Sequence, residues 1–226
     1  MLIIKRLGLV ELEPTWRAMQ QANKSRTSET PDEIWLLEHT PVFTLGLAGK
    51  PEHLLAPGDV PVIKIDRGGQ VTYHGPGQLV VYLLLDLKRL GFGVKALVKR
   101  IEQSVIDLLE EYEIESFRKS GMPGVYTKAP SPLRGEGWGE GKHVAHAKIS
   151  AIGLRVANHA TYHGLSLNID MDLEPFSRIN PCGYEGLAVT QMLDCGADFG
   201  NKDKMQVIGD RLIVHLSQQL YGTQHG

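Results

Sequence analysis

Short apolar runs rich in branched residues alternate along this chain with two long helical patterns. The alternation is typical of mixed α/β folds, because strands are short apolar runs whereas helices space their apolar residues three and four apart. Helices are predicted from about 94 to 112 and 203 to 220, with a shorter one following Pro14 toward Lys24. The predicted strands are residues 2–7, 33–38, 62–65, 78–85, 124–127, 148–156 and 165–169.

The composition sets the scale of the fold. The 226 residues are 42% hydrophobic and 22% charged, with a net charge of −2. We therefore expect a single globular domain, residues 1–226, which buries its core without a disulfide or structural metal. The near-zero charge gives no electrostatic footprint for nucleic acid, so no nucleic-acid partner is expected.

The apolar segments are too short for a membrane. The longest, residues 79–85, is far below the roughly 20 residues of a spanning helix, and Lys5 and Arg6 interrupt the apolar start of the chain. Two cysteines, Cys182 and Cys195, are too few for a secreted disulfide framework. We expect a cytoplasmic protein with no membrane partner.

A glycine-rich segment, RGGQVTYHGPGQ at residues 67–78, lies between two predicted strands. Glycines let a backbone approach a ligand closely, so such a segment can form the wall of a site. It matches neither familiar phosphate-binding glycine motif. A tight hairpin would also require glycine, but the polar side chains of Arg67, Thr72, Tyr73, His74 and Gln78 favour a site.

Cys182 follows Pro181 and precedes Gly183, a turn that projects a thiol from a loop. Most lone cysteines are inert small hydrophobic residues, an interpretation that suits Cys195 better. A nucleophilic cysteine must ionise, and a nearby cation favours the thiolate. The candidate cations are Lys148, His74 and His163.

Other charged residues have structural interpretations. Lys148 precedes an apolar run and could be an edge-strand lysine. The polar face of the 94–112 helix, which includes Glu102, is interpreted as a solvated surface. The spacings of His143, His146, His159 and His163 invite a metal site, but no carboxylate or cysteine nearby completes a ligand set, so no metal is expected. Residues 130–141, PSPLRGEGWGEG, are predicted to be a flexible surface insertion within about 129–146.

Four blocks together resemble the octanoyltransferases of lipoate biosynthesis: RGGQVTYHGPGQ at 67–78, KISAIGLRV at 148–156, HGLSLNI at 163–169 and PCG at 181–183. The resemblance covers roughly residues 2–193, and the insertion before Lys148 is its main departure. The fold that it implies is the α/β (α+β) catalytic domain of biotin and lipoate protein ligases, a mixed sheet flanked by helices, similar to the core of class II aminoacyl-tRNA synthetases.

The resemblance implies transfer of an octanoyl group from octanoyl-acyl carrier protein to a specific lysine of lipoyl domains, in 2-oxoacid dehydrogenase complexes and the glycine cleavage H protein. It implies no cofactor, neither ATP nor a metal, and we expect a monomer. Cys182 is implied to be the acyl-accepting nucleophile, and Lys148 the cation that favours its thiolate. The residues implied to line the acyl site are Arg67, Gly68, Gly69, Gln70, Val71, Thr72, Tyr73, His74, Ala151, Ile152, Gly153, Gly164, Leu165 and Ser166.

Two other functions compete with this one. An ATP-dependent lipoate or biotin protein ligase of the same fold would make an acyl adenylate and would need no nucleophilic cysteine. A catalytically inactive acyl-carrier or partner-binding module would use the glycine-rich loop only for recognition, but it would not need both Cys182 and Lys148. The groups that would stabilise the oxyanion remain open between backbone amides of the glycine-rich turns and His74.

Overall fold

The computed structural model describes residues 1–128, 146–200 and 203–222. The expected insertion around 129–146 lies almost entirely outside the described residues. Within them, no helix is long and apolar enough to cross a membrane.

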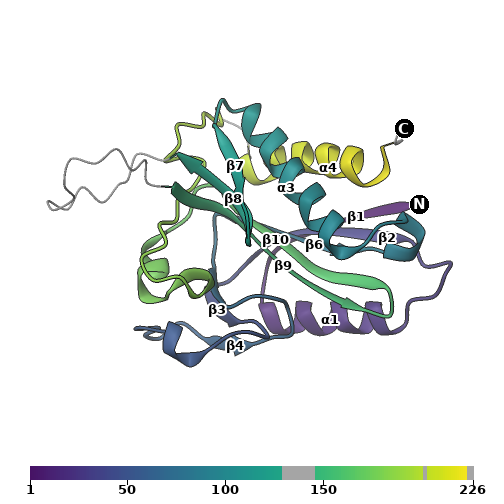
Figure 1. Cartoon of the computed structure of the whole chain (residues 1–226), viewed down its shortest axis with the longest axis horizontal. Helices are drawn as coiled ribbons and strands as arrows, with labels where there is room; N and C mark the ends of the chain where they lie inside the picture. Colours follow the sequence, from purple (N-terminus) through teal and green to yellow (C-terminus); the bar gives the residue numbers. More distant parts are fainter. Residues whose placement is uncertain (129–145, 201–202, 223–226) are drawn as a thin grey trace, which may run out of the picture.

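A seven-stranded mixed sheet forms the centre of the described structure (Figure 1). Its strand order is β1-β2-β6-β10-β9-β8-β7, in which β1 and β2 are parallel and the other neighbours are antiparallel. The strands are β1 (Leu2–Val10), β2 (Asp32–His39), β6 (Gln78–Leu84), β7 (Ser116–Lys119), β8 (Met122–Lys128), β9 (His146–Ala157) and β10 (Ala160–Asn168).

A smaller sheet of three strands, in the order β4-β3-β5, lies beside the large one (Figure 1). Its strands are β3 (Val42–Leu45), β4 (Val62–Lys64) and β5 (Val71–His74). The helices are α1 (Leu12–Lys24), α2 (Leu87–Leu90), α3 (Val94–Glu110) and α4 (Lys204–Tyr221), and three 3₁₀ turns span Pro51–His53, Glu174–Arg178 and Pro181–Gly183.

The sheet is covered on both faces, which explains the continuous apolar run of β6. Alternate residues of a strand point to opposite faces. Leu79, Val81 and Leu83 pack into the core with α3 and α4, whereas Val80 and Tyr82 pack toward α1. The predicted mixed sheet flanked by helices is therefore confirmed.

The sequence prediction missed several elements. Strand β5 lies inside the glycine-rich segment, where the glycines obscured its alternating pattern, and β3, β7 and α2 are too short for a clear periodicity. Strand β10 begins at Ala160 rather than at residue 165. The prediction began too late because Tyr162 and His163, although buried, carry polar groups and do not read as part of an apolar run. Glu102, assigned to a solvated face, is a buried residue whose carboxylate accepts a hydrogen bond from the backbone of β8.

Candidate active site

Cys182 lies in the short turn Pro181–Gly183, on the side of the small sheet. Its backbone adopts a left-handed conformation with φ +57°, which is uncommon for a residue with a side chain and costs about 1 to 3 kcal/mol. The surrounding chain holds this conformation, since Asn180 N donates to His53 O at 2.9 Å and Gly183 N donates to Asn180 O at 2.9 Å. The strained turn directs the thiol into a cavity between the two sheets.

Lys148 lies near the start of β9, and its backbone is paired on both sides. Strand β9 lies between β10 and β8, and Lys148 also donates from its N–H to Ala188 O at 2.8 Å and accepts from Thr190 N at 3.0 Å. The interpretation as an edge-strand lysine is therefore wrong. Only 5% of the residue is exposed, so its ammonium depends on protein partners rather than on water.

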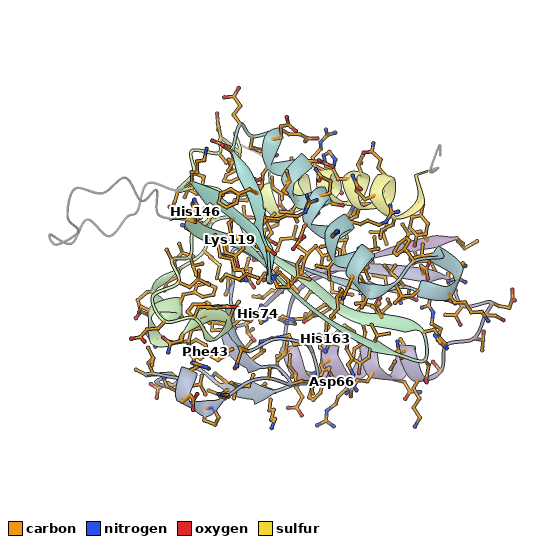
Figure 2. The ribbon with its side chains drawn as sticks, viewed as in Figure 1. Phe43, Asp66, His74, Lys119, His146 and His163 are labelled. Atoms are coloured by element: carbon orange, nitrogen blue, oxygen red, sulfur yellow. The ribbon has the colours of Figure 1, made fainter. Side chains whose placement is uncertain are left out.

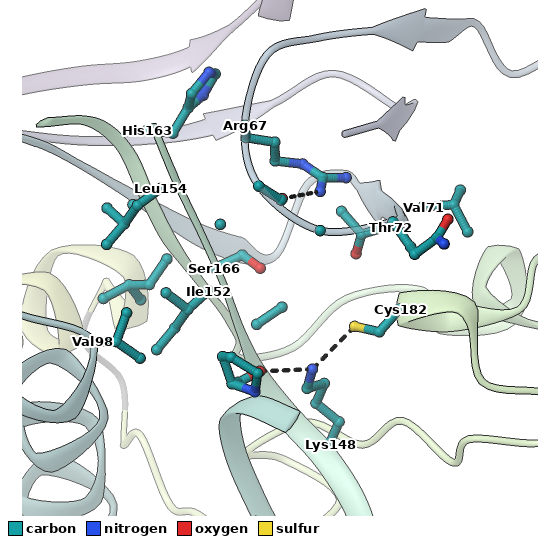
Figure 3. A pocket seen from close by; sticks show the side chains of 18 of the residues that line it. Arg67, Val71, Thr72, Val98, Lys148, Ile152, Leu154, His163, Ser166 and Cys182 are labelled. Carbon is teal, nitrogen blue, oxygen red and sulfur yellow. Dashed lines mark hydrogen bonds between the residues drawn. The ribbon is translucent and has the colours of Figure 1, made fainter. Parts of the chain in front are cut away.

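The ammonium of Lys148 meets the thiol of Cys182 across the cavity (Figure 3). Its Nζ lies 3.0 Å from Cys182 Sγ, donates to Pro123 O at 3.0 Å and lies 5.2 Å from the centre of the Tyr126 ring. Burial alone would lower the pKa of Lys148, but attraction to the Cys182 sulfur and to Tyr126 raises it above its ordinary value. The arrangement therefore favours a charged lysine that can stabilise a thiolate.

Gly124 on β8 makes room for the Lys148 side chain. Its φ is +128°, and a Cβ there would lie 2.4 Å from Ser150 O and 2.8 Å from Lys148 Cε. Beside it, the pairing of β8 with β9 shifts register between Val125 and Tyr126. Such an irregularity re-aims side chains locally, so the position of Lys148 depends on the absence of a side chain at Gly124.

The cavity has a volume of about 370 Å³, within the usual range for small-ligand sites. Apart from Tyr73, every residue implied by the family resemblance lines it, together with Cys182 and Lys148. The lining residues that the sequence reasoning did not assign are Ile65, Val80, Tyr82, Val94, Val98, Gly121, Met122, Pro123, Leu154 and Tyr184. Several of them are apolar strand or helix residues whose periodicity predicted only burial.

The apolar part of the wall lies away from the sulfur. Figure 3 shows Val98, Ile152 and Leu154 together on the side of the cavity opposite Cys182. An apolar chain attached to the sulfur would extend toward these side chains and remove their surfaces from water. The site can therefore hold a carbonyl carbon at Cys182 and an alkyl tail against α3 and β9.

Arg67 fixes the glycine-rich wall. Its guanidinium is buried and donates to Thr44 O at 2.8 Å and to Gly68 O at 2.9 Å. Burial lowers its pKa to about 10, partly offset by attraction to Cys182 and Tyr82. Gly68 N donates to Leu154 O at 3.0 Å, which joins this wall to β9.

Tyr73 lies outside the cavity, and its assignment to the acyl site is corrected. Its ring packs against Phe43 at 5.4 Å and Phe176 at 5.6 Å between ring centres, inside the core of the small sheet. Strand β5 explains the difference, because neighbouring residues of a strand point to opposite faces. From the sequence this segment was interpreted as a loop, and side chains in a loop do not alternate between two faces, so Tyr73 was grouped with its neighbours.

His74 lines the cavity but does not supply a cation. Burial, together with repulsion from His39, lowers its pKa to about 3, so the ring is neutral near pH 7. Gln78 donates from its amide nitrogen to Asn168 Oδ1 at 2.9 Å, which leaves Gln78 Oε1 to accept from His74 Nδ1 at 2.6 Å. His74 Nε2 is then an acceptor and cannot donate to an oxyanion.

His163 is likewise engaged away from the thiol. Its Nε2 donates to Asp66 Oδ1 at 2.9 Å, and burial lowers its pKa despite that carboxylate. Hydrogen bonds from His163, Tyr162, Gln20 and Trp16 outweigh burial and lower the pKa of Asp66. Of the three candidate cations, the structure brings only Lys148 into contact with Cys182.

The histidine spacings do not build a metal site in the described part of the chain. His163 pairs with Leu154 on β9, eight residues along the strand from His146, a separation of about 26 Å at 3.3 Å per residue. Figure 2 shows His146 and His163 well apart. No group of three potential metal ligands occurs among the described residues, and His143 lies outside them.

Comparison with known proteins agrees with this geometry. The model of the lipoyl protein ligase A/B catalytic domain matches residues 13–213. An octanoyltransferase of Laribacter hongkongensis is 54% identical over 222 residues, covering 98% of this chain and 97% of that protein. One from Chromobacterium violaceum is 56% identical over 218 residues, covering 96% and 95%.

Solved structures show the same fold at low sequence identity. A lipoate protein ligase from Thermoplasma acidophilum superposes with a TM-score of 0.68 at 14% identity, covering 97% of this chain and 84% of that one. A lipoate-protein ligase A bound with ATP gives 0.64 at 13%, covering 97% and 85%. The predicted biotin and lipoate protein ligase fold is thus confirmed.

The chain belongs to the lipoyl protein ligase A/B catalytic domain family. Within that family its near-full-length relatives at 52–56% identity are octanoyltransferases, so it is a member of this group of acyltransferases. The resemblance drawn from the four sequence blocks is confirmed.

The buried histidines predict how stability depends on pH. The unfolded chain protonates His39 and His74 near the ordinary pKa of 6.5, whereas burial lowers their pKa in the folded chain to about 4 and about 3. The unfolded state binds more protons in this window, so stability is full above pH 6.5 and falls as the pH drops toward 4. In this window each histidine lowers the free energy of unfolding by about 1 kcal/mol for each pH unit that the pH drops. Urea unfolding between pH 7 and 4.5 measures this slope. His39→Gln should reduce the slope of the free energy of unfolding against pH, whereas His159→Gln, at an exposed position, should leave this slope unchanged. Equal slopes in the two variants would contradict the assignment of the pH dependence to the buried histidines.

Replacing Gly124 should disturb the Lys148–Cys182 contact. Gly124→Ala places a Cβ against Lys148 Cε, so we expect iodoacetamide to label Cys182 about tenfold more slowly at pH 7, as for a one-unit rise in the labelling midpoint. The matched control is Gly91→Ala, which has φ +75° but no heavy atom within 4 Å of the added Cβ. Both variants should lose stability, but only Gly124→Ala should lose thiol reactivity. Equal labelling in the two would show that Lys148 does not depend on Gly124.

Proposed function

We propose that the protein transfers an octanoyl group from octanoyl-acyl carrier protein to a lysine of a lipoyl domain, through a thioester on Cys182. The observation that supports this most directly is the 3.0 Å contact between Lys148 Nζ and Cys182 Sγ at the wall of an apolar cavity. The octanoyltransferase relatives support the acyl group. Lipoyl domains of 2-oxoacid dehydrogenase complexes and the glycine cleavage H protein are the proposed acceptors.

In the first half-reaction, the Cys182 thiolate attacks the carbonyl carbon of the donor thioester. The bond between that carbon and the carrier sulfur breaks, and the departing carrier thiolate takes a proton from the Lys148 ammonium. The products are the free carrier thiol, a neutral Lys148 and octanoyl-Cys182. One difficult transfer is thereby divided into two easier ones.

In the second half-reaction, the neutral amine of the acceptor lysine attacks the thioester carbonyl. The attacking nitrogen gives a proton to Lys148, an amide bond forms, and the Cys182 thiolate leaves. This restores the starting ammonium and thiolate, so one lysine serves as acid and then as base. Backbone amides of the glycine-rich wall are the proposed oxyanion donors, since His74 Nε2 is an acceptor.

This chemistry requires neither ATP nor a metal, because the donor thioester is already activated. We propose that the enzyme acts as a monomer in the cytoplasm, and that residues 1–226 form one catalytic domain. An ATP-dependent ligase is the alternative function, favoured by a fold shared with a lipoate-protein ligase bound with ATP. It would use the cavity without acylating Cys182.

Covalent acylation distinguishes these functions. Incubation with octanoyl-acyl carrier protein should add the mass of one octanoyl group to the intact protein, mapped to Cys182 by peptide analysis. Cys182→Ala should abolish the adduct and the transfer to a lipoyl domain. The matched control, Cys195→Ala, should retain both, because Cys195 packs against the main core. An active enzyme that carries no adduct, and that needs ATP and free octanoate, would instead establish the ligase.

The pH dependence of alkylation tests the role of Lys148. Lys148→Ala should move the midpoint of Cys182 labelling by iodoacetamide upward by about 1 to 3 pH units, because a positive charge within a few ångströms favours the thiolate. Lys148→Arg should restore most of the midpoint, yet leave turnover low, since a guanidinium does not release its proton. The same labelling midpoint in the wild type, Lys148→Ala and Lys148→Arg would show that Lys148 has only a structural role.

A further inference from the structure

Glu102 is a buried carboxylate that the proposed reaction does not use. It lies on the inner side of α3, its side chain is 7% exposed, and it forms an ion pair with Arg118 of β7 at 3.2 Å. Its second partner is unusual: Glu102 Oε1 accepts a hydrogen bond from the backbone N–H of Gly124 at 3.0 Å. A carboxylate this buried is held by the groups it bonds, and here one of them belongs to the active-site wall.

The N–H of Gly124 and the C=O of Pro123 belong to the same peptide group. That carbonyl is the one that accepts the hydrogen bond from Lys148 Nζ at 3.0 Å. A peptide group is planar and rigid, so an acceptor that fixes its N–H also fixes the direction of its C=O. Glu102, the peptide, Lys148 and Cys182 therefore form one continuous chain of hydrogen bonds.

Two features make this peptide dependent on Glu102. Gly124 adopts φ +128°, a conformation that glycine tolerates but does not enforce. The pairing of β8 with β9 also shifts register next to it, so the regular ladder is interrupted there. A charge-assisted hydrogen bond is about twice as strong as a neutral one, and it polarises the amide so that its oxygen becomes a better acceptor.

We propose that Glu102 is a positioning residue, which holds the Pro123–Gly124 peptide so that its carbonyl keeps the Lys148 ammonium against Cys182. The inference rests on the proposed function for its catalytic consequence, but the geometric coupling is testable without turnover. Direct electrostatics predicts the opposite effect, because the negative charge of Glu102 disfavours a thiolate. Loss of positioning and loss of charge therefore move the reactivity of Cys182 in opposite directions.

The test measures iodoacetamide labelling of Cys182 against pH in three variants. Glu102→Asp keeps the charge but withdraws the carboxylate from Gly124 N, so we expect the midpoint to rise and labelling at pH 7 to slow by about 3- to 10-fold. Glu102→Gln keeps an acceptor of the same length and should remain closer to wild type. The control is the exposed Glu110→Gln on the same helix, which should match wild type. Arg67 and Tyr126, two further groups that interact electrostatically with Cys182, are unchanged throughout.

A double-mutant cycle separates positioning from general destabilisation. In a Lys148→Ala background, Glu102→Asp should produce no further change in the labelling midpoint, because its effect passes through Lys148. Thermal unfolding of each variant identifies any that fails to fold, and Glu102→Gln, the least disruptive change, then carries the comparison. Its neutral hydrogen bond to Gly124 N is about half as strong, so positioning predicts a smaller slowing of about twofold. The loss of charge alone predicts faster labelling, so faster labelling in Glu102→Gln would contradict the proposal. An unchanged midpoint in folded Glu102→Asp, or an equal shift with and without Lys148, would overturn the proposal. If labelling behaves as expected but no acyl-enzyme forms, the proposed function fails and the positioning role stands.

Discussion

The contact between the Lys148 ammonium and the Cys182 sulfur is the interaction on which the rest of the site depends. Removing an ammonium from water is costly, and only partners with good geometry offset that cost. Lys148 has three such partners: a sulfur, a backbone carbonyl and the face of an aromatic ring. The carbonyl of Pro123 and the ring of Tyr126 both belong to β8, whereas the sulfur comes from the turn Pro181–Gly183. The contact therefore forms only when β8, β9 and the Cys182 turn are all assembled.

The neutral groups around this pair are as important as the charged ones. His74 and His163 line the same cavity, yet burial keeps both rings uncharged near pH 7 and each is tied to a fixed hydrogen-bond partner. Protonated histidines there would compete with Lys148 for the sulfur. The cavity thus concentrates positive charge on Lys148 and Arg67, of which Lys148 is the one that contacts the Cys182 sulfur.

Much of the scaffold could be predicted from the sequence, because α3, α4 and β6 have strong apolar patterns set by burial. The site residues were predictable only through the family blocks, since a lone cysteine and a lone lysine carry little signal. The assignments of Glu102 and Tyr73 were wrong for two different physical reasons. Helical periodicity shows which face of a helix is polar, but it does not show whether a backbone N–H of a neighbouring strand bonds to a residue on that face, as Gly124 N does to Glu102. Tyr73 was treated as a loop residue, so the alternation of side chains along a strand was not applied to it. The hydrogen bond from Lys148 Nζ to Pro123 O joins residues 25 positions apart in the sequence. It depends on the pairing of β8 with β9, so no local sequence pattern predicts it.

Lys148 and Cys182, the two residues proposed to react, are held by different sheets. Lys148 lies on β9 of the large sheet, whereas the turn that carries Cys182 is joined to the small sheet through the core around Ile179 and Phe43. The distance between Cys182 Sγ and Lys148 Nζ is therefore set by how the two sheets pack against each other. The hydrogen bond from Gly68 N to Leu154 O joins the glycine-rich wall to β9. Under the proposed mechanism, a substitution that changes how the two sheets pack would change the distance from Lys148 to Cys182, even at a position that does not touch the octanoyl group.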